Sequence, residues 1–469
     1  MKNLPRSTPE KQGVKSQAII DFLNAIEKNN QELHSFMLVK NGHVISECWW
    51  EPYKAHYPHQ VYSIAKSLTS TGIGMAVDEG LLTVDTLVAD IFKKELDELD
   101  GRYDEKIKKM TVKHLMTMTT GMEYDAWEWN DNNIKNFLSS HIRHEPGSKV
   151  CYHSFLPAYM ESAIITRLTG QTLYEYLKPR LFEPLDINAE WPDIGGVTYG
   201  CNYIELTTEE IAKFGQLYLQ RGNWNGKQLI SEKWIDEATK NGYHFGKCEP
   251  DGVYMASGFL GQHCIVLPNE NSVIAITSTT DGDVLFNLLW DILLPALREN
   301  NAPNDDVADY QKMKEMQKNL SHLKINETSE PFPTFKSEYK ICDEKNIYKD
   351  VEKVYIEFND DECILALHYN HSEIASLLRI KNKEWLETIS ALHGFGYNGY
   401  GYRTHTLGEW QTGENEDIFT IAHWHPEAYG KDIITIKFNE DKSKIALQFY
   451  GNIYSTPDPT VYGIYVKII

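Results

Sequence analysis

The spacing of apolar residues changes once along this chain, and that change limits the folds open to it. Between about residues 82 and 245, apolar side chains recur every three or four positions, which predicts a largely helical region. Beyond residue 335 they alternate with polar side chains, as in Val354–Phe358, Cys363–Tyr369 and Ile433–Phe438. Alternation with a period of two predicts closely spaced β-strands. The chain therefore contains a helix-rich part followed by an all-β part.

Strand signals also occur at both ends of the helical region. Asn41-Gly42 is a strong hairpin signal between the expected strands Phe36–Lys40 and His43–Trp49. Two more strand-like runs, Tyr254–Pro268 and Ser272–Ser278, follow the helices. This order predicts an α/β domain in which distant parts of the chain complete one antiparallel sheet flanked by helices, with a helical subdomain inserted.

A polar stretch separates the two patterns. Residues 301–334 contain Pro331-Phe332-Pro333 and a short helical pattern. We expect a first domain over residues 1–300, a linker over 301–334 and a barrel- or sandwich-like β domain over 335–469.

Composition argues against several classes of function. The 469 residues carry a net charge of −21, which disfavours nucleic acid or an anionic membrane as a partner. The N-terminal residues lack the apolar core of a secretion signal, and no later segment is apolar for long enough to cross a bilayer, so we expect a cytoplasmic protein. The seven cysteines form no Cys-x-x-Cys pair, which favours free thiols over disulfides or a zinc site.

The run from Val61 to Leu68 is the strongest candidate for chemistry. It predicts the first turn of a long apolar helix, on which Ser63 and Lys66 lie one turn apart on the same face. A serine hydroxyl becomes a good nucleophile when a base removes its proton, and a lysine among apolar residues can do so because removal from water disfavours its charged form. Since a helix N-terminus has free N–H groups, the N–H of Ser63 is expected to form half of an oxyanion hole.

The spacing of these two residues is not specific by itself. Ser-x-x-Lys also occurs at Ser321–Lys324 and at Ser337–Lys340. The alternative interpretation is a serine that caps the helix, followed one turn later by a solvated lysine.

Four segments occur in an order that is typical of one enzyme family: Tyr62–Leu82, Val112–Met122, Glu145–Ser148 and Leu206–Gly215. In this order they resemble the serine β-lactamase and penicillin-binding protein superfamily, in its class C branch, which includes esterases and 6-aminohexanoate-oligomer hydrolases. The resemblance covers about residues 8–298. It implies a serine hydrolase of β-lactamase-like fold that uses neither a metal nor another cofactor.

The resemblance assigns a third catalytic residue, through the family's second motif. The family's Tyr-x-Asn motif corresponds here to Tyr152-His153-Ser154. By resemblance, Tyr152 lies across the pocket from Ser63, shares a proton with Lys66 and delivers it to the leaving group. A phenol beside an ammonium group is a credible acid and base. Ser154 replaces the amide that contacts substrate in relatives.

The third family motif, Lys-Thr-Gly or His-x-Gly in relatives, corresponds to Ala256-Ser257-Gly258. These three residues are expected substrate contacts. Because a glycine at a strand edge lets backbone approach the nucleophile, the N–H of Phe259 is expected to complete the oxyanion hole. Ala256 takes the place of the basic residue that would hold a substrate carboxylate.

The residues that line the substrate pocket are less defined. Tyr124 and Trp127 fall in a region that lines the cleft in relatives, so they are candidate substrate contacts, with packing as the alternative. The sequence predicts an esterase or amidase that acts on a small molecule or short peptide through an acyl-enzyme. β-Lactamase or D-amino-acid peptidase activity, or a non-catalytic binding or sensor protein, are the alternatives. No cofactor, nucleic acid or membrane partner is expected.

Overall fold

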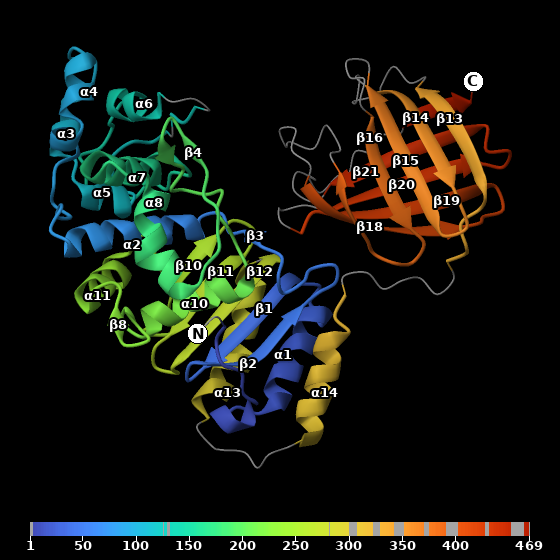
Figure 1. The fold of residues 1–469 in the computed structure, drawn as a ribbon, viewed down its shortest axis with the longest axis horizontal. Helices are drawn as coiled ribbons and strands as arrows, with labels where there is room; N and C mark the ends of the chain where they lie inside the picture. The colour runs from blue at the N-terminus through green and yellow to red at the C-terminus, as the bar shows by residue number, and fades with distance from the viewer. Residues whose placement is uncertain are drawn as a thin grey trace. The chain divides into compact units, whose positions relative to one another are not determined.

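The chain forms two compact units in a computed structural model (Figure 1). The first comprises residues 1–50 and 54–320, and the second comprises residues 51–53 and 321–469. The division falls inside the predicted linker. The structure describes residues 3–124, 126–128, 132–280, 282–299, 307–321, 329–341, 351–369, 375–390, 402–426, 431–451 and 464–468.

The first unit is built on a six-stranded antiparallel sheet. Its strand order is β2 (His43–Trp49), β1 (Glu32–Lys40), β12 (Ser272–Thr279), β11 (Gln262–Leu267), β10 (Tyr254–Gly258) and β9 (Gly246–Lys247). Strand β1 lies between β2 and β12, with Phe36 opposite Cys48 on one side and Ile276 on the other. The predicted hairpin is confirmed, and distant parts of the chain do complete one sheet.

The run Tyr254–Pro268 contains two strands rather than the single strand-like stretch expected. Strand β10 ends at Gly258 and β11 begins at Gln262. The turn between them places Leu260 at φ +64° and Gly261 at φ +93°. A mainly apolar run does not show by its pattern where a turn falls. The sequence signal for this turn is the pair of glycines, Gly258 and Gly261.

Helices pack on both faces of this sheet (Figure 1). The apolar cluster on one face contains residues of α1 (Ser16–Lys28), α12 (Gly282–Leu288), the π-helix η4 (Leu289–Leu293) and α13 (Leu294–Arg298). The cluster on the other face contains residues of α2 (Ile64–Asp78) and α10 (Thr208–Leu219). Helix α2, which begins at the Ser63 motif, is therefore a core element.

Helix α14 (Val307–Lys318) comes from the predicted linker and packs in the first unit. Its Met313 is buried in the same apolar cluster as α1. Its Gln317 Nε2 donates a hydrogen bond of 2.7 Å to Ser46 Oγ of β2. The short helical pattern seen in the sequence is thus a fixed part of this unit.

The central part of the first unit is mainly helical, as predicted. It contains α3 (Val88–Ile91), α4 (Lys93–Glu98), η2 (Glu105–Lys109), α5 (Val112–Met116), α6 (Asn133–Ser139), α7 (Leu156–Thr169), α8 (Leu173–Leu177), η3 (Lys178–Phe182), α9 (Glu183–Leu185) and α11 (Glu232–Asn241). Short strand pairs interrupt it, namely β3 (His59–Gln60) with β6 (Glu205–Leu206), β4 (Asp193–Ile194) with β5 (Val197–Thr198), and β7 (Asn223–Trp224) with β8 (Lys227–Gln228). These pairs were not expected from the sequence.

The second unit is a ten-stranded antiparallel sheet, which confirms a β-rich C-terminal domain. Its order is β16 (Ser376–Lys381), β15 (Glu362–Tyr369), β14 (Val351–Phe358), β13 (Phe335–Ile341), β22 (Ile464–Ile468), β21 (Lys444–Gly451), β20 (Lys431–Asn439), β19 (Glu416–Trp424), β18 (Tyr402–Gln411) and β17 (Leu386–Ser390). An isolated bridge joins Asn382, just beyond β16, to Gly408 of β18. The core contains tilted and edge-on aromatic rings, including Phe358, Trp410 and Phe419.

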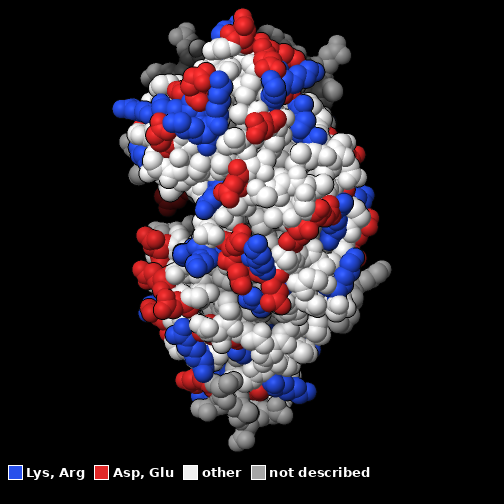
Figure 2. Space-filling model, turned by 90° about the vertical axis from the view of Figure 1, so that its left-hand side faces the viewer, with Lys and Arg blue, Asp and Glu red and all other residues white. Residues whose placement is uncertain are grey.

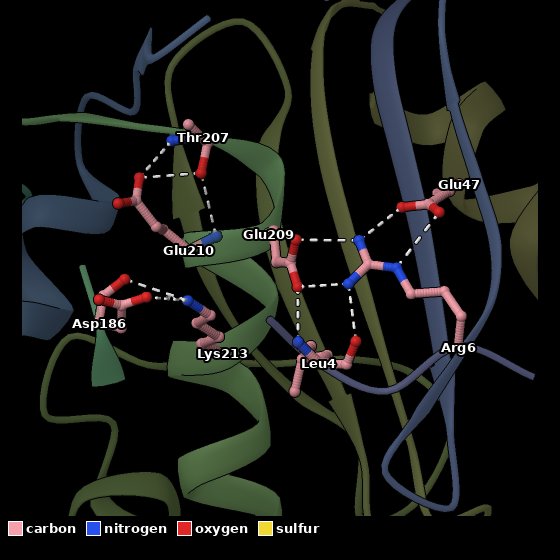
Figure 3. A network of polar contacts seen from close by, with 8 residues as sticks. All are labelled: Leu4, Arg6, Glu47, Asp186, Thr207, Glu209, Glu210 and Lys213. Atoms are coloured by element: carbon pink, nitrogen blue, oxygen red, sulfur yellow. Dashed lines mark hydrogen bonds and ion pairs between the residues drawn. The ribbon is translucent and has the colours of Figure 1, made fainter. Parts of the chain in front are cut away.

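Arg6 joins the N-terminal segment to two layers of the first unit (Figure 3). Its guanidinium donates to Glu209 of α10 at 2.7 and 2.9 Å and to Glu47 of β2 at 2.7 and 3.3 Å. The N–H of Leu4 donates to the same Glu209 carboxylate at 2.6 Å. Paired bonds of a guanidinium to carboxylates fix both distance and orientation, so this network holds α10 over the sheet.

Three further properties concern membrane-spanning helices, surface charge and cysteine pairing. None of the helices in the described ranges is both long and apolar enough to cross a membrane. Figure 2 shows acidic and basic side chains interspersed over the face that it draws. The cysteines that the structure describes are all unbridged, as predicted.

Candidate active site

The segment before α2 is fixed by neighbouring backbone. Strand β3 pairs with β6, and the N–H of Val61 donates to the carbonyl O of Ile204 at 3.1 Å. Tyr62 has a φ of +49°, a left-handed conformation that is unusual for a bulky residue. Strained backbone of this kind persists only where the surroundings fix it, and it is common at functional sites. It places Ser63 at the N-cap position of α2.

Ser63 lies between an amine and a phenol. Lys66 Nζ donates to Ser63 Oγ at 2.7 Å, and Tyr152 Oη lies 2.9 Å from the same oxygen. Lys66 Nζ also donates to the carbonyl O of Cys201 at 3.2 Å and lies 5.4 Å from the centre of the Tyr152 ring. The structure therefore brings together the three residues that the sequence predicted as catalytic.

The alternative interpretation of this helical turn does not fit the structure. The Ser63 side chain makes no capping hydrogen bond. Lys66 is 3% exposed, so it is buried rather than solvated. The Ser-x-x-Lys match at Ser337–Lys340 lies on strand β13. Residues three apart on a strand point to opposite faces, so this serine and lysine are not side by side.

Tyr152 is held in the segment that precedes α7. The N–H of Cys151 donates to the carbonyl O of Met118 at 2.8 Å, and Nε2 of the buried His153 lies 3.2 Å from the carbonyl O of Met122. Both carbonyls belong to the motif Val112–Met122, so this motif supports the Tyr152 segment. Tyr152 itself is 64% exposed, which leaves part of its ring accessible.

Strand β10 passes directly beside the nucleophile segment. A Cβ atom at Gly258 would lie 2.2 Å from the carbonyl O of Val61. No side chain fits at that distance, so the predicted close approach of backbone at this glycine is confirmed. The next residue, Phe259, packs its ring edge-on against Tyr62, with the ring centres 5.8 Å apart.

Two backbone amides near this contact are candidates for an oxyanion hole. Within the described ranges, the N–H groups of Ser63 and Phe259 donate to no backbone carbonyl. The N–H of Ser63 is one of the free donors that a helix N-terminus provides. Preorganised N–H donors of this type stabilise the charge that develops on a reacting carbonyl oxygen. Their role here stays a prediction.

We expect Gly258→Ala to impair both stability and turnover. The added methyl group must push β10 away from Val61, because it would overlap a backbone carbonyl rather than a flexible side chain. Overpacking of this kind costs about 1–3 kcal/mol, and a displacement of about 1 Å near reacting groups can lower kcat by about 10²-fold. Thermal unfolding and ester hydrolysis measure the two effects. In the control Gly282→Ala, the new Cβ would lie 3.7 Å from Phe286, an ordinary contact, so neither quantity should fall.

Comparison with known proteins identifies this part of the chain. Residues 30–191, which include Ser63, Lys66 and Tyr152, match the family model described as Beta-lactamase. The chain carries a β-lactamase family domain. It is 21% identical over 318 residues to a 6-aminohexanoate-dimer hydrolase of Paenarthrobacter ureafaciens, a match that covers 59% of this chain and 81% of that protein.

Solved structures support the fold of the β-lactamase family domain. A penicillin-binding protein homologue from Caulobacter crescentus is similar with a TM-score of 0.50 and 15% identity, over 64% of this chain and 97% of that one. A family VIII carboxylesterase is similar with a TM-score of 0.50 and 15% identity, over 61% of this chain and 98% of that one. The family match confirms the resemblance to β-lactamases that the sequence motifs indicated, and these two structures support the fold.

The other residues expected on β10 have different surroundings. Ala256 is 1% exposed and packs in the same apolar cluster as α2. Ser257 Oγ lies 3.1 Å from Nδ1 of His263, whose ring packs against Phe286 of α12 at 4.9 Å between centres. Burial lowers the pKa of His263 to about 4, so this imidazole is neutral at pH 7. In the β-lactamase family domain, the Ser257 hydroxyl is thus engaged by a neutral histidine.

The structure separates the predicted pocket residues into two kinds. Tyr124 is 82% exposed, and Ser154 is also exposed, two residues after Tyr152. Trp127 is half-buried and stacks on Phe155, with ring centres 5.1 Å apart. Trp127 therefore has a packing role, whereas Tyr124 and Ser154 are accessible.

Three residues of the site were not found from the sequence. Cys201 and Val61 act through their carbonyl groups, and Tyr62 acts through its backbone conformation. Every residue except proline offers the same N–H and C=O groups, so residue type gives no signal for such contacts.

Proposed function

We propose that the β-lactamase family domain of this chain is a serine hydrolase that cleaves an ester or amide through an acyl-enzyme. The observation that carries the proposal is the position of Ser63 Oγ within hydrogen-bonding distance of both Lys66 Nζ and Tyr152 Oη. A nucleophile in contact with two groups that can move its proton is the arrangement that covalent catalysis requires. The names of the similar proteins, a 6-aminohexanoate-dimer hydrolase and a carboxylesterase, support hydrolysis of an amide or ester.

Acylation would use all three side chains. Lys66 accepts the hydroxyl proton while Ser63 Oγ forms a bond to the substrate carbonyl carbon. The carbonyl oxygen becomes an oxyanion, which the N–H groups of Ser63 and Phe259 would bind. The bond from carbon to the leaving alcohol or amine then breaks. Tyr152 donates its hydroxyl proton to that leaving group and recovers a proton from Lys66.

Deacylation would run the same relay with water. A water molecule attacks the acyl carbon and gives up one proton to the neutral amine of Lys66, either directly or through the Tyr152 hydroxyl, which passes its own proton on. The bond to Ser63 Oγ breaks, Oγ takes up that proton, and the carboxylic acid leaves. The three protein groups return to their starting state, so the cycle consumes only the substrate and water.

The surroundings of the relay support a neutral substrate, either a small molecule or a short peptide. Ala256 stands where relatives carry the basic residue for a carboxylate, and it is buried. Phe259, which follows the close contact of Gly258 with Val61, is 59% exposed and offers an apolar surface. An esterase or amidase is therefore favoured over an efficient β-lactamase or D-amino-acid peptidase.

Covalent trapping tests the proposal. A fluorophosphonate should add to one residue of the protein, and mass spectrometry of peptides should locate the adduct on Ser63. Ser63→Ala should remain unlabelled. Labelling should be unchanged in Ser337→Ala, because that serine belongs to the Ser-x-x-Lys match on strand β13.

Two results would count against the proposal. A wild-type protein that is labelled elsewhere would assign another nucleophile. A wild-type protein that neither reacts with the fluorophosphonate nor cleaves any of a panel of p-nitrophenyl esters and small amides would favour a binding or sensor protein.

A further inference from the structure

A buried carboxylate in α7 has no part in the chemistry proposed above. Glu161 is fully buried, and its Oε1 lies 2.8 Å from Nε2 of His244, whose side chain is 4% exposed. Its other oxygen, Oε2, has no hydrogen-bond partner among the residues that the structure describes. Removing a carboxylate from water costs free energy that one partner does not fully restore. Stability alone is therefore a poor explanation for this pair.

His244 connects the carboxylate to the nucleophile helix. The carbonyl O of His244 accepts a hydrogen bond of 2.6 Å from Oγ of Ser67, the residue that follows Lys66 on α2. The N–H of His244 donates to the carbonyl O of Met116 at 3.3 Å. His244 has a φ of +58°, an unusual conformation for a side chain of this size, which its surroundings must fix. By holding the imidazole, Glu161 helps to fix the carbonyl that Ser67 binds.

The same carboxylate belongs to the element that follows Tyr152. Helix α7, which carries Glu161, begins at Leu156 and packs against α2. Buried on these two helices are also Ser70 Oγ of α2 and Ser162 Oγ of α7, for which the described ranges contain no hydrogen-bond partner. Contacts selected for stability alone rarely leave several buried polar atoms unpaired.

We propose that Glu161 and His244 are positioning residues that set the distance between Lys66 and Tyr152. The pair joins α2, which carries Lys66, to α7, which fixes the end of the Tyr152 segment. This inference rests on the proposed function and extends it to two residues outside the reacting groups. The general base and acid must be held within hydrogen-bonding reach, so a small shift of either helix lowers the rate of the chemical step.

Two substitutions separate positioning from bulk stability. Glu161→Met keeps the volume but removes the acceptor, whereas Glu161→Gln keeps an oxygen that accepts from His244 Nε2. We expect kcat per fluorophosphonate-reactive site to fall by about tenfold or more in Glu161→Met, with KM within about twofold of the wild type. Glu161→Gln should restore kcat to within about threefold, because the hydrogen bond remains.

A buried carboxylate in the turn between β11 and β12 provides a matched control. Glu270 is also buried, its Oε1 accepts from Arg298 Nε at 2.7 Å, and its Oε2 has no partner in the described part. Glu270→Met should lower the unfolding temperature without changing kcat per reactive site. An equal fall of kcat in Glu270→Met and Glu161→Met would overturn the proposal, because it would show a general effect of stability.

A crystal structure of Glu161→Met tests positioning independently of turnover. We expect the distance from Lys66 Nζ to Ser63 Oγ, 2.7 Å in the wild type, to exceed 3.5 Å, or Tyr152 Oη to move away from Ser63 by a similar amount. Unchanged distances would overturn the proposal. Failure of the proposed function is a separate result, since it would appear as a wild-type Ser63 that does not react.

Discussion

Replacing Lys66 with methionine should lower kcat for a p-nitrophenyl ester by about 10²–10⁴-fold. Methionine has a similar length but no amine. Ser63 Oγ therefore loses the Lys66 amine that lies 2.7 Å away and that would accept the hydroxyl proton during attack. The unfolding temperature should stay the same or rise, because burying an amine away from water is costly and methionine fills a similar volume without that cost. Steady-state kinetics and thermal unfolding, measured on the same preparation, check both expectations.

Lys213→Met is the matched control for this experiment. Lys213 is as buried as Lys66, lies on α10 and donates to the carbonyl O of Asp186 at 3.0 Å (Figure 3). It shares no hydrogen bond with Ser63. The control should therefore keep kcat within about threefold of the wild type. A Lys66→Met protein that also stays within that range would remove Lys66 from the proposed proton relay.

Acid should destabilise the first unit over a pH range set by two buried histidines. Burial, with a smaller effect of the nearby His34, lowers the pKa of His59 to about 3, and burial lowers the pKa of His263 to about 4, both from 6.5. In the unfolded chain both imidazoles bind a proton as the pH falls through 6.5, whereas in the folded protein they stay neutral. Unfolding therefore takes up protons, and acid favours it.

The size of the acid effect follows from the two pKa shifts. Their contribution to the free energy of unfolding is fully present above pH 6.5 and is lost as the pH falls toward the folded pKa values. The loss is up to about 1.4 kcal/mol per pH unit for each histidine, or roughly 4 kcal/mol for both between pH 6.5 and 4.5. Urea unfolding measured across this range would give the slope directly.

Substitution of one histidine should change that slope. His59→Gln removes one of the two groups. The part of the slope between pH 6.5 and 4.5 that comes from the two histidines should therefore fall by about half. His141→Gln changes a side chain that is 81% exposed and lies 3.4 Å from Asp104, and because an exposed ion pair contributes little, the slope should change far less than in His59→Gln. Equal slopes for wild type and His59→Gln would show that His59 is already protonated in the folded protein.

The sequence predicted Ser63 and Lys66 from residue type and helical spacing, whereas Tyr152 was assigned only by resemblance to the family's Tyr-x-Asn motif. Ser63 and Lys66 lie one turn apart only on a helix, and the apolar residues that follow them predicted that helix. The Asn41-Gly42 turn likewise determined the hairpin of β1 and β2. Features of this kind depend on local preferences, which a single sequence contains.

Strand β18 shows why other elements were not predicted. Its inward positions include Thr404 and Thr406, which are fully buried, and Gly408, where a Cβ would lie 2.8 Å from Phe332 and Phe419. An inner face made of threonine and glycine does not alternate between apolar and polar residues, so the period of two is lost. Strand β13, with Ser337 between Phe335 and Tyr339, has the same weakness.

The contacts that complete the site escaped prediction for a different reason. The carbonyl groups of Cys201 and Val61 meet Lys66 and Gly258 only after the chain has folded. The partner in each case is main chain, which varies with neither composition nor spacing. Side chains that react can be found in a sequence more readily than the backbone that surrounds them.

In the turn after Gly258, the main chain and the side chain of Phe259 have separate roles. If the N–H of Phe259 binds the oxyanion, that task belongs to the main chain, whereas the benzyl group offers an exposed apolar surface. Laboratory evolution could then exchange the side chain at 259 to admit bulkier or more polar acyl groups without rebuilding the apparatus that stabilises negative charge. Position 62 offers no such freedom, because the left-handed backbone of Tyr62 leads directly into Ser63 at the start of α2.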